Sequence, residues 1–196
     1  MNGAWFDPDD GIMAPFGIVA QVNSSWQAEH PSKPVRYVGS GDAGGTVSAF
    51  RIDRATGVLD LIGQVTTDSS GTPGGLSYIG GQSLSTDSPE YTGTKSAAEL
   101  GMSRDGRFVY TSNRGENTIV VFAAGWRTGR LTLVQRIPCG GVSPWSFSIH
   151  RGSRWMLVAN QVSSTVNPFS IDPRSGKLTD TGKSMPIPNP DCITFG

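Results

Sequence analysis

The histidine and cysteine side chains are the residues of this sequence best suited to nucleophilic or metal chemistry near neutral pH. His30 and His150 lie 120 residues apart, and Cys139 and Cys192 show neither a Cys-x-x-Cys motif nor the Cys/His spacing of a zinc site. The Gly-x-Ser-x-Gly elbow of serine hydrolases is also missing. The sequence therefore predicts no metal, no cofactor and no catalytic triad, and we expect both thiols to be buried or half-buried.

The charge balance limits the kinds of partner. Sixteen Lys and Arg residues offset 16 Asp and Glu residues, so the formal net charge is +0. Because no basic surplus is present to neutralise phosphates, we expect no nucleic-acid partner. No apolar run reaches the length of about 18 residues that a membrane span needs. The first ten residues are acidic where a secretion signal is basic, which favours a cytoplasmic protein that does not contact membranes.

A repeated pattern organises the chain and must position any functional residue. Residues 107–113 match residues 154–160, which lie 47 positions later, and an upstream copy precedes the middle one by 72 positions. The upstream spacing is longer than the downstream spacing because of an insertion. The insertion falls in a Gly/Ser/Thr-rich stretch, which we expect to be one long surface loop. The predicted organisation is an unassigned segment over 1–24, repeats near 25–62, 97–143 and 144–196, and a loop insertion over 63–96.

Each copy has the pattern of short strands joined by tight turns. Residues 108–110 and 119–122 are β-rich apolar bursts, residues 131–134 alternate with period two, and Asp105–Gly106 provides a hairpin turn. Four short strands in about 47 residues is typical of a β-propeller blade. The predicted fold is therefore all-β, with four-stranded antiparallel propeller blades. The chain has about four blades' worth of residues, forming a partial ring or one that a partner chain completes.

The run at residues 97–115, AAELGMSRDGRFVYTSNRG, resembles the blade signature of the seven-bladed propeller lactonase family. That family includes propeller-type 6-phosphogluconolactonase and fungal carboxy-cis,cis-muconate cyclase. Residues 128–131, 158–164 and 190–195 are similar to it as well. The resemblance covers about residues 27–196 and implies that the chain holds the C-terminal half of such a propeller.

The resemblance also implies an activity and a site. Family members open or close a ring ester, which needs one group to move a proton and a cation to hold an anion. Glu99, in Ala-Ala-Glu, and Arg114, in Ser-Asn-Arg-Gly, match the family's functional pattern. The match implies that Glu99 is the catalytic acid/base and that Arg114 is the catalytic anion clamp. From position alone, a structural ion pair between neighbouring strands is the alternative interpretation.

The equivalent positions in the other repeats depart from the family pattern. At the repeat offsets, Glu99 corresponds to Gln27 and Ser146, neither of which titrates near neutral pH, where the family commonly has histidine. Tryptophans precede both, and Trp26 and Trp145 are open to two interpretations, packing between blades or stacking on a ligand. The substrate-binding residues that the resemblance implies are Gln27, Trp145, Ser146, Asn160 and Gln161.

Two functions follow from these features. The first is a lactone-processing enzyme that hydrolyses or reversibly cyclises a small carboxylated or phosphorylated lactone, muconate cyclisation being one form of that reaction. The second is a non-catalytic binding or assembly module, a homo-oligomer that completes the ring, or a remnant without activity. The motif around Glu99 favours the first, whereas the loss of titratable groups at Gln27 and Ser146 favours the second.

Overall fold

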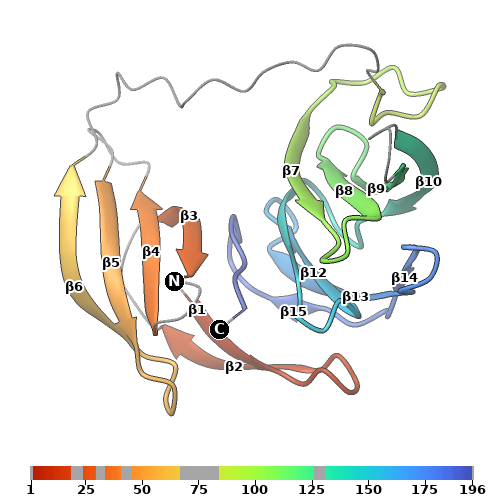
Figure 1. Cartoon of the computed structure of the whole chain (residues 1–196). Helices are drawn as coiled ribbons and strands as arrows, with labels where there is room; N and C mark the ends of the chain where they lie inside the picture. The colour runs from red at the N-terminus through yellow and green to blue at the C-terminus, as the bar shows by residue number, and fades with distance from the viewer. Residues whose placement is uncertain are drawn as a thin grey trace. The chain divides into compact units, whose positions relative to one another are not determined.

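Every regular element of the structure, a computed structural model, is a β-strand (Figure 1). The structure describes residues 2–18, 24–29, 34–40, 46–66, 84–125 and 131–195. In chain order the strands are β1 (Asn2–Phe6), β2 (Met13–Ile18), β3 (Ser24–Glu29), β4 (Val35–Ser40), β5 (Thr46–Ile52), β6 (Leu59–Thr66), β7 (Ala97–Met102), β8 (Phe108–Asn113), β9 (Thr118–Ala124), β10 (Leu131–Pro138), β11 (Pro144–Ile149), β12 (Trp155–Asn160), β13 (Thr165–Ile171), β14 (Leu178–Asp180) and β15 (Met185–Pro186). Within these ranges no helix has the length and apolar character needed to cross a membrane.

Three antiparallel sheets contain most of these strands, and each sheet is built from consecutive strands. We call β3–β6 the first blade, β7–β10 the middle blade and β11–β15 the last blade. In the last blade β13 pairs with both β14 and β15. The predicted all-β fold of four-stranded antiparallel sheets is therefore confirmed. The predicted loop over 63–96 includes the end of β6, residues 67–83 lie outside the described part of the chain, and residues 84–96 form an irregular connecting segment.

One turn type recurs at three places along the chain, Asp7–Gly11, Asp53–Gly57 and Asp172–Gly176. In each turn the glycine N–H donates to the aspartate carbonyl at 2.7–2.9 Å, and the aspartate carboxylate accepts a backbone N–H two residues later at 2.8–2.9 Å. The glycines have φ between 71° and 74°, a conformation that favours glycine. Two of these turns join the third and fourth strands of a blade. The β1–β2 hairpin, which the sequence left unassigned, thus has the geometry of a blade's outer hairpin.

The chain divides into two compact units. The first unit contains the first blade and most of the β1–β2 hairpin, whereas the second contains residues 6–12 with the middle and last blades. Residues 6–12 include the Asp7–Gly11 turn, and the Trp155 indole N–H donates to the carbonyl of Pro8. The middle and last blades therefore belong to one packed body, which also holds Glu99 and Arg114.

The core of the second unit lies between the middle and last blades. In β9, Ile119 and Val121 face the last blade, whereas Val120 and Phe122 face the opposite side of the sheet. Burying each such side chain contributes about 1.5–3 kcal/mol to folding. The buried residues shared between the two blades are Phe108, Tyr110, Ile119, Val121, Cys139, Phe147, Met156, Val158, Phe169, Ile171 and Leu178.

Polar contacts between the same two blades add directional restraint to this apolar core. The Tyr110 hydroxyl donates to the carbonyl of Gly176 at 3.1 Å. The side-chain amide of Gln135 donates to the carbonyl of Leu178 at 2.9 Å and accepts the N–H of Leu178 at 2.8 Å. These bonds join β8 and β10 of the middle blade to the β13–β14 hairpin of the last blade, and so restrain how the two blades pack.

Candidate functional site

The first strands of the middle and last blades, β7 and β11, are sheet edges that contact one another. Gly101 permits their close approach, because a Cβ at this position would lie 2.8 Å from Cε2 of Phe147. Each strand carries a β-bulge near its start, between Ala97 and Leu100 in β7 and between Pro144 and Ser146 in β11. Bulges redirect side chains and are common beside active sites. Glu99 therefore projects from a redirected stretch of backbone at the junction of two blades.

The Glu99 carboxyl group is half-buried and lies against the last blade. Burial raises the pKa of Glu99 above its ordinary value of 4.5, and this effect outweighs hydrogen bonds from the Leu100 backbone and the Ser146 hydroxyl, which lower it. Ser146 is itself only 1% exposed. The backbone N–H of Glu99 donates to Oγ of Ser112 at 2.9 Å. The side chain is thus placed as a carboxyl group whose pKa is shifted toward neutrality, as general acid/base chemistry requires.

Arg114 lies in the turn after β8. Its backbone N–H donates to the carbonyl of Ser96 at 2.7 Å, which places the start of this turn. The guanidinium carbon lies 4.2 Å from the centroid of the Trp145 ring, a cation–π contact. The buried Nε of Arg114 has no hydrogen-bond partner among the described residues. A buried guanidinium N–H without an acceptor is a donor ready for an anionic oxygen.

Within the described residues, no ion pair joins Glu99 to Arg114, so the structural ion pair considered above is not what the structure shows; the described ion pair of this blade is Arg107 with Asp105. The two charged side chains instead contact adjacent residues of β11, Ser146 for Glu99 and Trp145 for Arg114. The structure therefore brings together four of the residues that the sequence singled out. A carboxyl group and a guanidinium thus contact consecutive residues of β11, and no ion pair between them is described.

Three other sequence-predicted site residues are not brought to Glu99 by any contact in the described part of the chain. Asn160 is fully buried, and its Nδ2 donates to the Cys139 carbonyl at 3.0 Å and to Oδ1 of Asn167 at 3.1 Å, whereas its own buried Oδ1 has no hydrogen-bond partner among the described residues. Gln161 follows β12, where its N–H donates to the Ser143 carbonyl at 3.0 Å. Gln27 lies in β3, and its side chain is outside the described structure.

The strand register corrects the predicted equivalence of Gln27 with Glu99. Glu99 and Ser146 are each the second residue after the pair that opens the bulge, and in β3 that residue is Trp26, paired with Gly39. The β4–β5 connection has five residues and the β8–β9 connection four, so the offset changes from 72 to 73 across it. A constant offset, as used for the sequence, is therefore wrong by one residue in β3.

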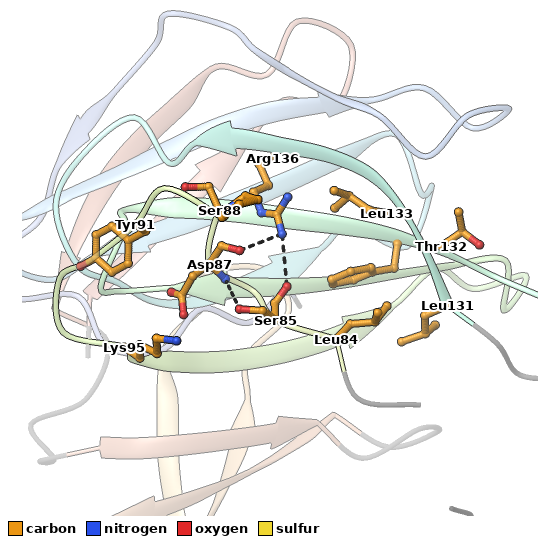
Figure 2. Close-up of a pocket in the computed structure, with 12 residues that line it drawn as sticks. Leu84, Ser85, Asp87, Ser88, Tyr91, Lys95, Leu131, Thr132, Leu133 and Arg136 are labelled. Carbon is orange, nitrogen blue, oxygen red and sulfur yellow. Dashed lines mark hydrogen bonds between the residues drawn. The ribbon is translucent and has the colours of Figure 1, made fainter. Parts of the chain in front are cut away.

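A cavity of about 550 Å³ lies elsewhere in the second unit, between the connecting segment and the outer strand β10 (Figure 2). Its polar groups already hold the structure together. The Arg136 guanidinium donates to the carbonyls of Ser85, Thr86 and Asp87, and the Tyr91 hydroxyl donates to the Gly115 carbonyl at 2.6 Å. Neither Glu99 nor Arg114 lines the cavity. These hydrogen bonds hold the connecting segment against β10 and against the turn that carries Arg114.

The described histidine and both cysteines lie away from Glu99. The His150 ring packs between Phe6 and Phe195, with centroids 5.6 and 5.0 Å away, and burial, with a smaller effect of Arg151, lowers its pKa. His30 lies outside the described residues. Cys139 and Cys192 are free thiols. In the described ranges, no group of three or more His, Cys, Asp or Glu side chains is placed to hold a metal ion.

Comparison with known proteins gives a family match and curated relatives. The family described as "Lactonase, 7-bladed beta-propeller" matches residues 72–195. The 6-phosphogluconolactonase of Bacillus subtilis is 28% identical over 106 residues, which is 54% of this chain and 30% of the relative. The 6-phosphogluconolactonase of Formosa agariphila is 39% identical over 84 residues, 42% of this chain and 24% of the relative. The matched regions thus span about a quarter to a third of these relatives.

Solved structures show the same architecture. The periplasmic gluconolactonase PpgL of Pseudomonas aeruginosa superposes with a TM-score of 0.52 and 24% identity, over 91% of this chain and 44% of that one. A protein from Lactobacillus plantarum gives a TM-score of 0.51, also at 24% identity, over 96% of this chain and 50% of that one. At this level of identity the likeness shows the fold, which is that of a partial propeller.

Proposed function

Because the chain belongs to the seven-bladed β-propeller lactonase family, we propose that it hydrolyses a small lactone bearing a carboxylate or phosphate, with Glu99 and Arg114 as its catalytic residues. One observation carries this proposal. A half-buried carboxyl group with a raised pKa and a guanidinium with an unpartnered buried N–H meet neighbouring residues of β11 without pairing with each other. The relatives named 6-phosphogluconolactonase make a phosphorylated sugar lactone the first substrate to test.

In the proposed hydrolysis, Glu99 takes a proton from the attacking water while the water oxygen bonds to the lactone carbonyl carbon. The carbonyl π electrons move to oxygen and form a tetrahedral oxyanion. When this oxyanion collapses, the bond from carbon to the ring oxygen breaks, and Glu99 returns its proton to the ring oxygen. The product is the hydroxy acid, and Glu99 ends as the carboxylate with which it began.

Arg114 supplies the positive charge in this scheme. Its Nε–H is available to an anionic group of the substrate, and stacking on Trp145 limits the orientations of the guanidinium. Trp145 is 36% exposed, so part of its ring is open to solvent and to a ligand. The proposal therefore assigns substrate binding to Arg114 and Trp145, and proton transfer to Glu99.

The test is turnover of 6-phosphogluconolactone and of unphosphorylated gluconolactone by the purified chain, measured above the spontaneous hydrolysis rate. Glu99→Gln should lower kcat by about 10²–10⁴-fold, the usual contribution of a positioned acid/base. Arg114→Gln should raise KM for the phosphorylated substrate most. Glu90→Gln and Arg104→Gln, which alter exposed side chains, are the matched controls. Wild-type chain without turnover refutes the proposal, and equal rates with Glu99→Gln remove Glu99 from the mechanism.

The pH profile adds a second readout to the same assay. As a general base, Glu99 must be ionised, so kcat/KM should rise with pH through a pKa above 4.5 and then level off. Glu99→Gln should flatten this rise. Ring closure of an unsaturated acid such as a carboxymuconate is a separate reaction, in which a carboxylate oxygen adds to one carbon of the C=C bond and a proton is delivered to the other. We propose Glu99 as the proton donor and Arg114 as the anion clamp for it, and it is assayed with the same variants.

A second candidate function is assembly with another copy of the chain. The edge strand β7 presents two large apolar side chains to solvent, Leu100 at 68% and Met102 at 55% exposure. If a second copy covers them, light scattering should give the mass of a dimer, and Leu100→Ser with Met102→Ser should return the monomer. A monomeric wild type at high micromolar concentration contradicts this candidate.

A further inference from the structure

The bulge that carries Glu99 recurs in the first strand of all three blades. In β11 the register passes from Pro144–Asn160 to Ser146–Ala159, and in β3 it passes from Ser24–Ser40 to Trp26–Gly39. In β7 it passes from Ala97–Asn113 to Leu100–Thr111. The bulge is therefore a feature of the blade frame and is independent of the residue that projects from it.

The residue opposite the bulge differs between the blades. It is the residue just before the last position of the second strand, namely Ser112 in the middle blade, Ala159 in the last blade and Gly39 in the first. Two of the three blades thus form the same bulge with no hydroxyl at this place. The Ser112 hydroxyl is not needed for the bulge, so its presence calls for another explanation.

Ser112 contacts the backbone of Glu99 from a fully enclosed position. Its Oγ accepts the Glu99 N–H at 2.9 Å, and the residue is 0% exposed. A bulge interrupts the ladder, so a backbone N–H within it lacks a regular partner on the adjacent strand. A buried hydroxyl that accepts this N–H therefore holds the backbone of the one residue in these three bulges whose side chain is a carboxylic acid.

We propose that Ser112 is a positioning residue that holds the Glu99 backbone, so that the Glu99 carboxyl group stays half-buried beside Ser146 at the junction of β7 and β11. This inference rests on the proposed lactonase function for its kinetic consequences, but the positioning itself does not require turnover. The backbone of Glu99 is held through its N–H by Ser112 of its own blade, and its carboxyl group lies near the Ser146 hydroxyl of the last blade, which lowers its pKa slightly against the effect of burial.

The decisive variant is Ser112→Ala, which places in the middle blade the residue that the last blade has at the equivalent position. The fold should persist because Ala159 is compatible with the same bulge. The matched control is Ser148→Ala, which removes a serine hydroxyl from β11 without touching Glu99. In the lactonase assay Ser112→Ala should lower kcat about tenfold with KM unchanged, whereas the control should keep both constants.

Two measurements decide the positioning role without turnover. Carboxyl carbon NMR, with Glu99→Gln to assign the signal, should show the Glu99 pKa moving toward 4.5 in Ser112→Ala, because a released backbone lets the carboxyl group reach water. Amide hydrogen exchange of Glu99 should speed up at least tenfold. Wild type without turnover refutes the lactonase function alone. An unchanged Glu99 pKa and exchange rate in Ser112→Ala overturns the positioning role.

Discussion

The middle and last blades share a backbone frame and differ in the side chains attached to it. Both begin with a bulged edge strand, both end their second strand in a fully buried asparagine, and both fix the next residue by a backbone bond. The N–H of Arg114 donates to the Ser96 carbonyl at 2.7 Å, and that of Gln161 donates to the Ser143 carbonyl at 3.0 Å. The middle blade places a carboxylic acid and a guanidinium where the last blade has Ser146 and Gln161. At these two positions the same backbone frame therefore carries charged side chains in the middle blade and neutral side chains in the last blade.

The two blades also differ in what their buried asparagines hold. Asn113 donates to the Asp87 carboxylate at 2.7 Å, whereas Asn160 donates to the Cys139 carbonyl at 3.0 Å. Asp87 belongs to the connecting segment, and Cys139 belongs to the short link between β10 and β11. The asparagine before Arg114 is therefore anchored to a charged side chain on a long connecting segment. Its counterpart in the last blade is anchored to a backbone carbonyl on a short link.

Replacing the two asparagines with alanine should break this comparison most strongly. Asn113→Ala removes a donor from a buried carboxylate and should lower the free energy of unfolding by about 3 kcal/mol, because hydrogen bonds to charged groups are the stronger ones. Asn160→Ala removes a donor from two neutral oxygens, the Cys139 carbonyl and Oδ1 of Asn167, and should cost about 1–2 kcal/mol. Urea unfolding followed by tryptophan fluorescence measures both. Equal losses would show that the attachments are energetically alike.

Gly101→Ala tests how closely β7 approaches β11. The added methyl would lie 2.8 Å from Phe147, so one strand must shift, and overpacking of this kind costs about 1–3 kcal/mol. Ser148→Ala, at the equivalent place in the last blade, should change the free energy of unfolding by less than about 0.5 kcal/mol. The same denaturation experiment serves for both variants. A Gly101→Ala protein as stable as wild type would mean that the junction is looser than the structure shows.

The Tyr110 hydroxyl sharpens the comparison, because it reaches from the middle blade to the Gly176 carbonyl of the last blade. Tyr110→Phe should lower the free energy of unfolding by about 1 kcal/mol near neutral pH. Burial raises the pKa of Tyr110 to about 12 from 10.0. The folded state therefore keeps this proton while the unfolded state loses it, so stability from this group is full below pH 10.0 and falls as pH rises toward 12. Tyr110→Phe should lose this part of the alkaline dependence, and an identical alkaline profile would contradict it.

The smallest effect concerns Glu99 and stability. Because burial raises the pKa of Glu99, the folded state binds its proton more tightly than the unfolded state does. Its contribution to stability is present below 4.5 and is lost as pH rises through the folded-state pKa. Relative to wild type, Glu99→Gln should therefore gain stability as pH increases from 4.5 and then level off. Thermal unfolding at a series of pH values measures the difference, and a difference that shrinks with increasing pH would be the wrong sign.

The fold was predictable from the sequence because a repeat, its turn residues and its strand periodicity all describe the same blade. The spacing of 47 residues between the middle and last copies holds throughout. Each strand connection in the middle blade has the same length as its counterpart in the last blade, and so does the bulge. The offset fails at Gln27, because one additional residue between β4 and β5 moves the register. Such an insertion in a Gly-rich stretch of sequence leaves no periodic signal by which to locate it.

The candidate site was predictable only in part. The family motif gave Glu99 and Arg114 as candidates, but their contacts with Ser146 and Trp145 depend on how two blades pack, which one copy of a repeat does not encode. Asn160 is a candidate because it lies in a family motif, and the structure adds that its Nδ2 donates to the Cys139 carbonyl and to Oδ1 of Asn167. Ser112 stands in the Ser-Asn-Arg-Gly motif, but the motif does not show that its hydroxyl accepts the Glu99 N–H. That contact appears only in the folded sheet, and the comparison with Ala159 singles it out.

The most direct test of the account is the response of two indole N–H signals to 6-phosphogluconate in one NMR titration of the whole chain. Trp145 stacks on Arg114 at the start of β11, whereas Trp155 starts β12 at the other end of the sheet and donates to the Pro8 carbonyl. We predict that the Trp145 signal shifts and saturates, that the Trp155 signal does not shift, and that Arg114→Gln abolishes the shift of the Trp145 signal. A Trp145 signal that does not move, or one that moves equally in Arg114→Gln, would contradict a site at this junction.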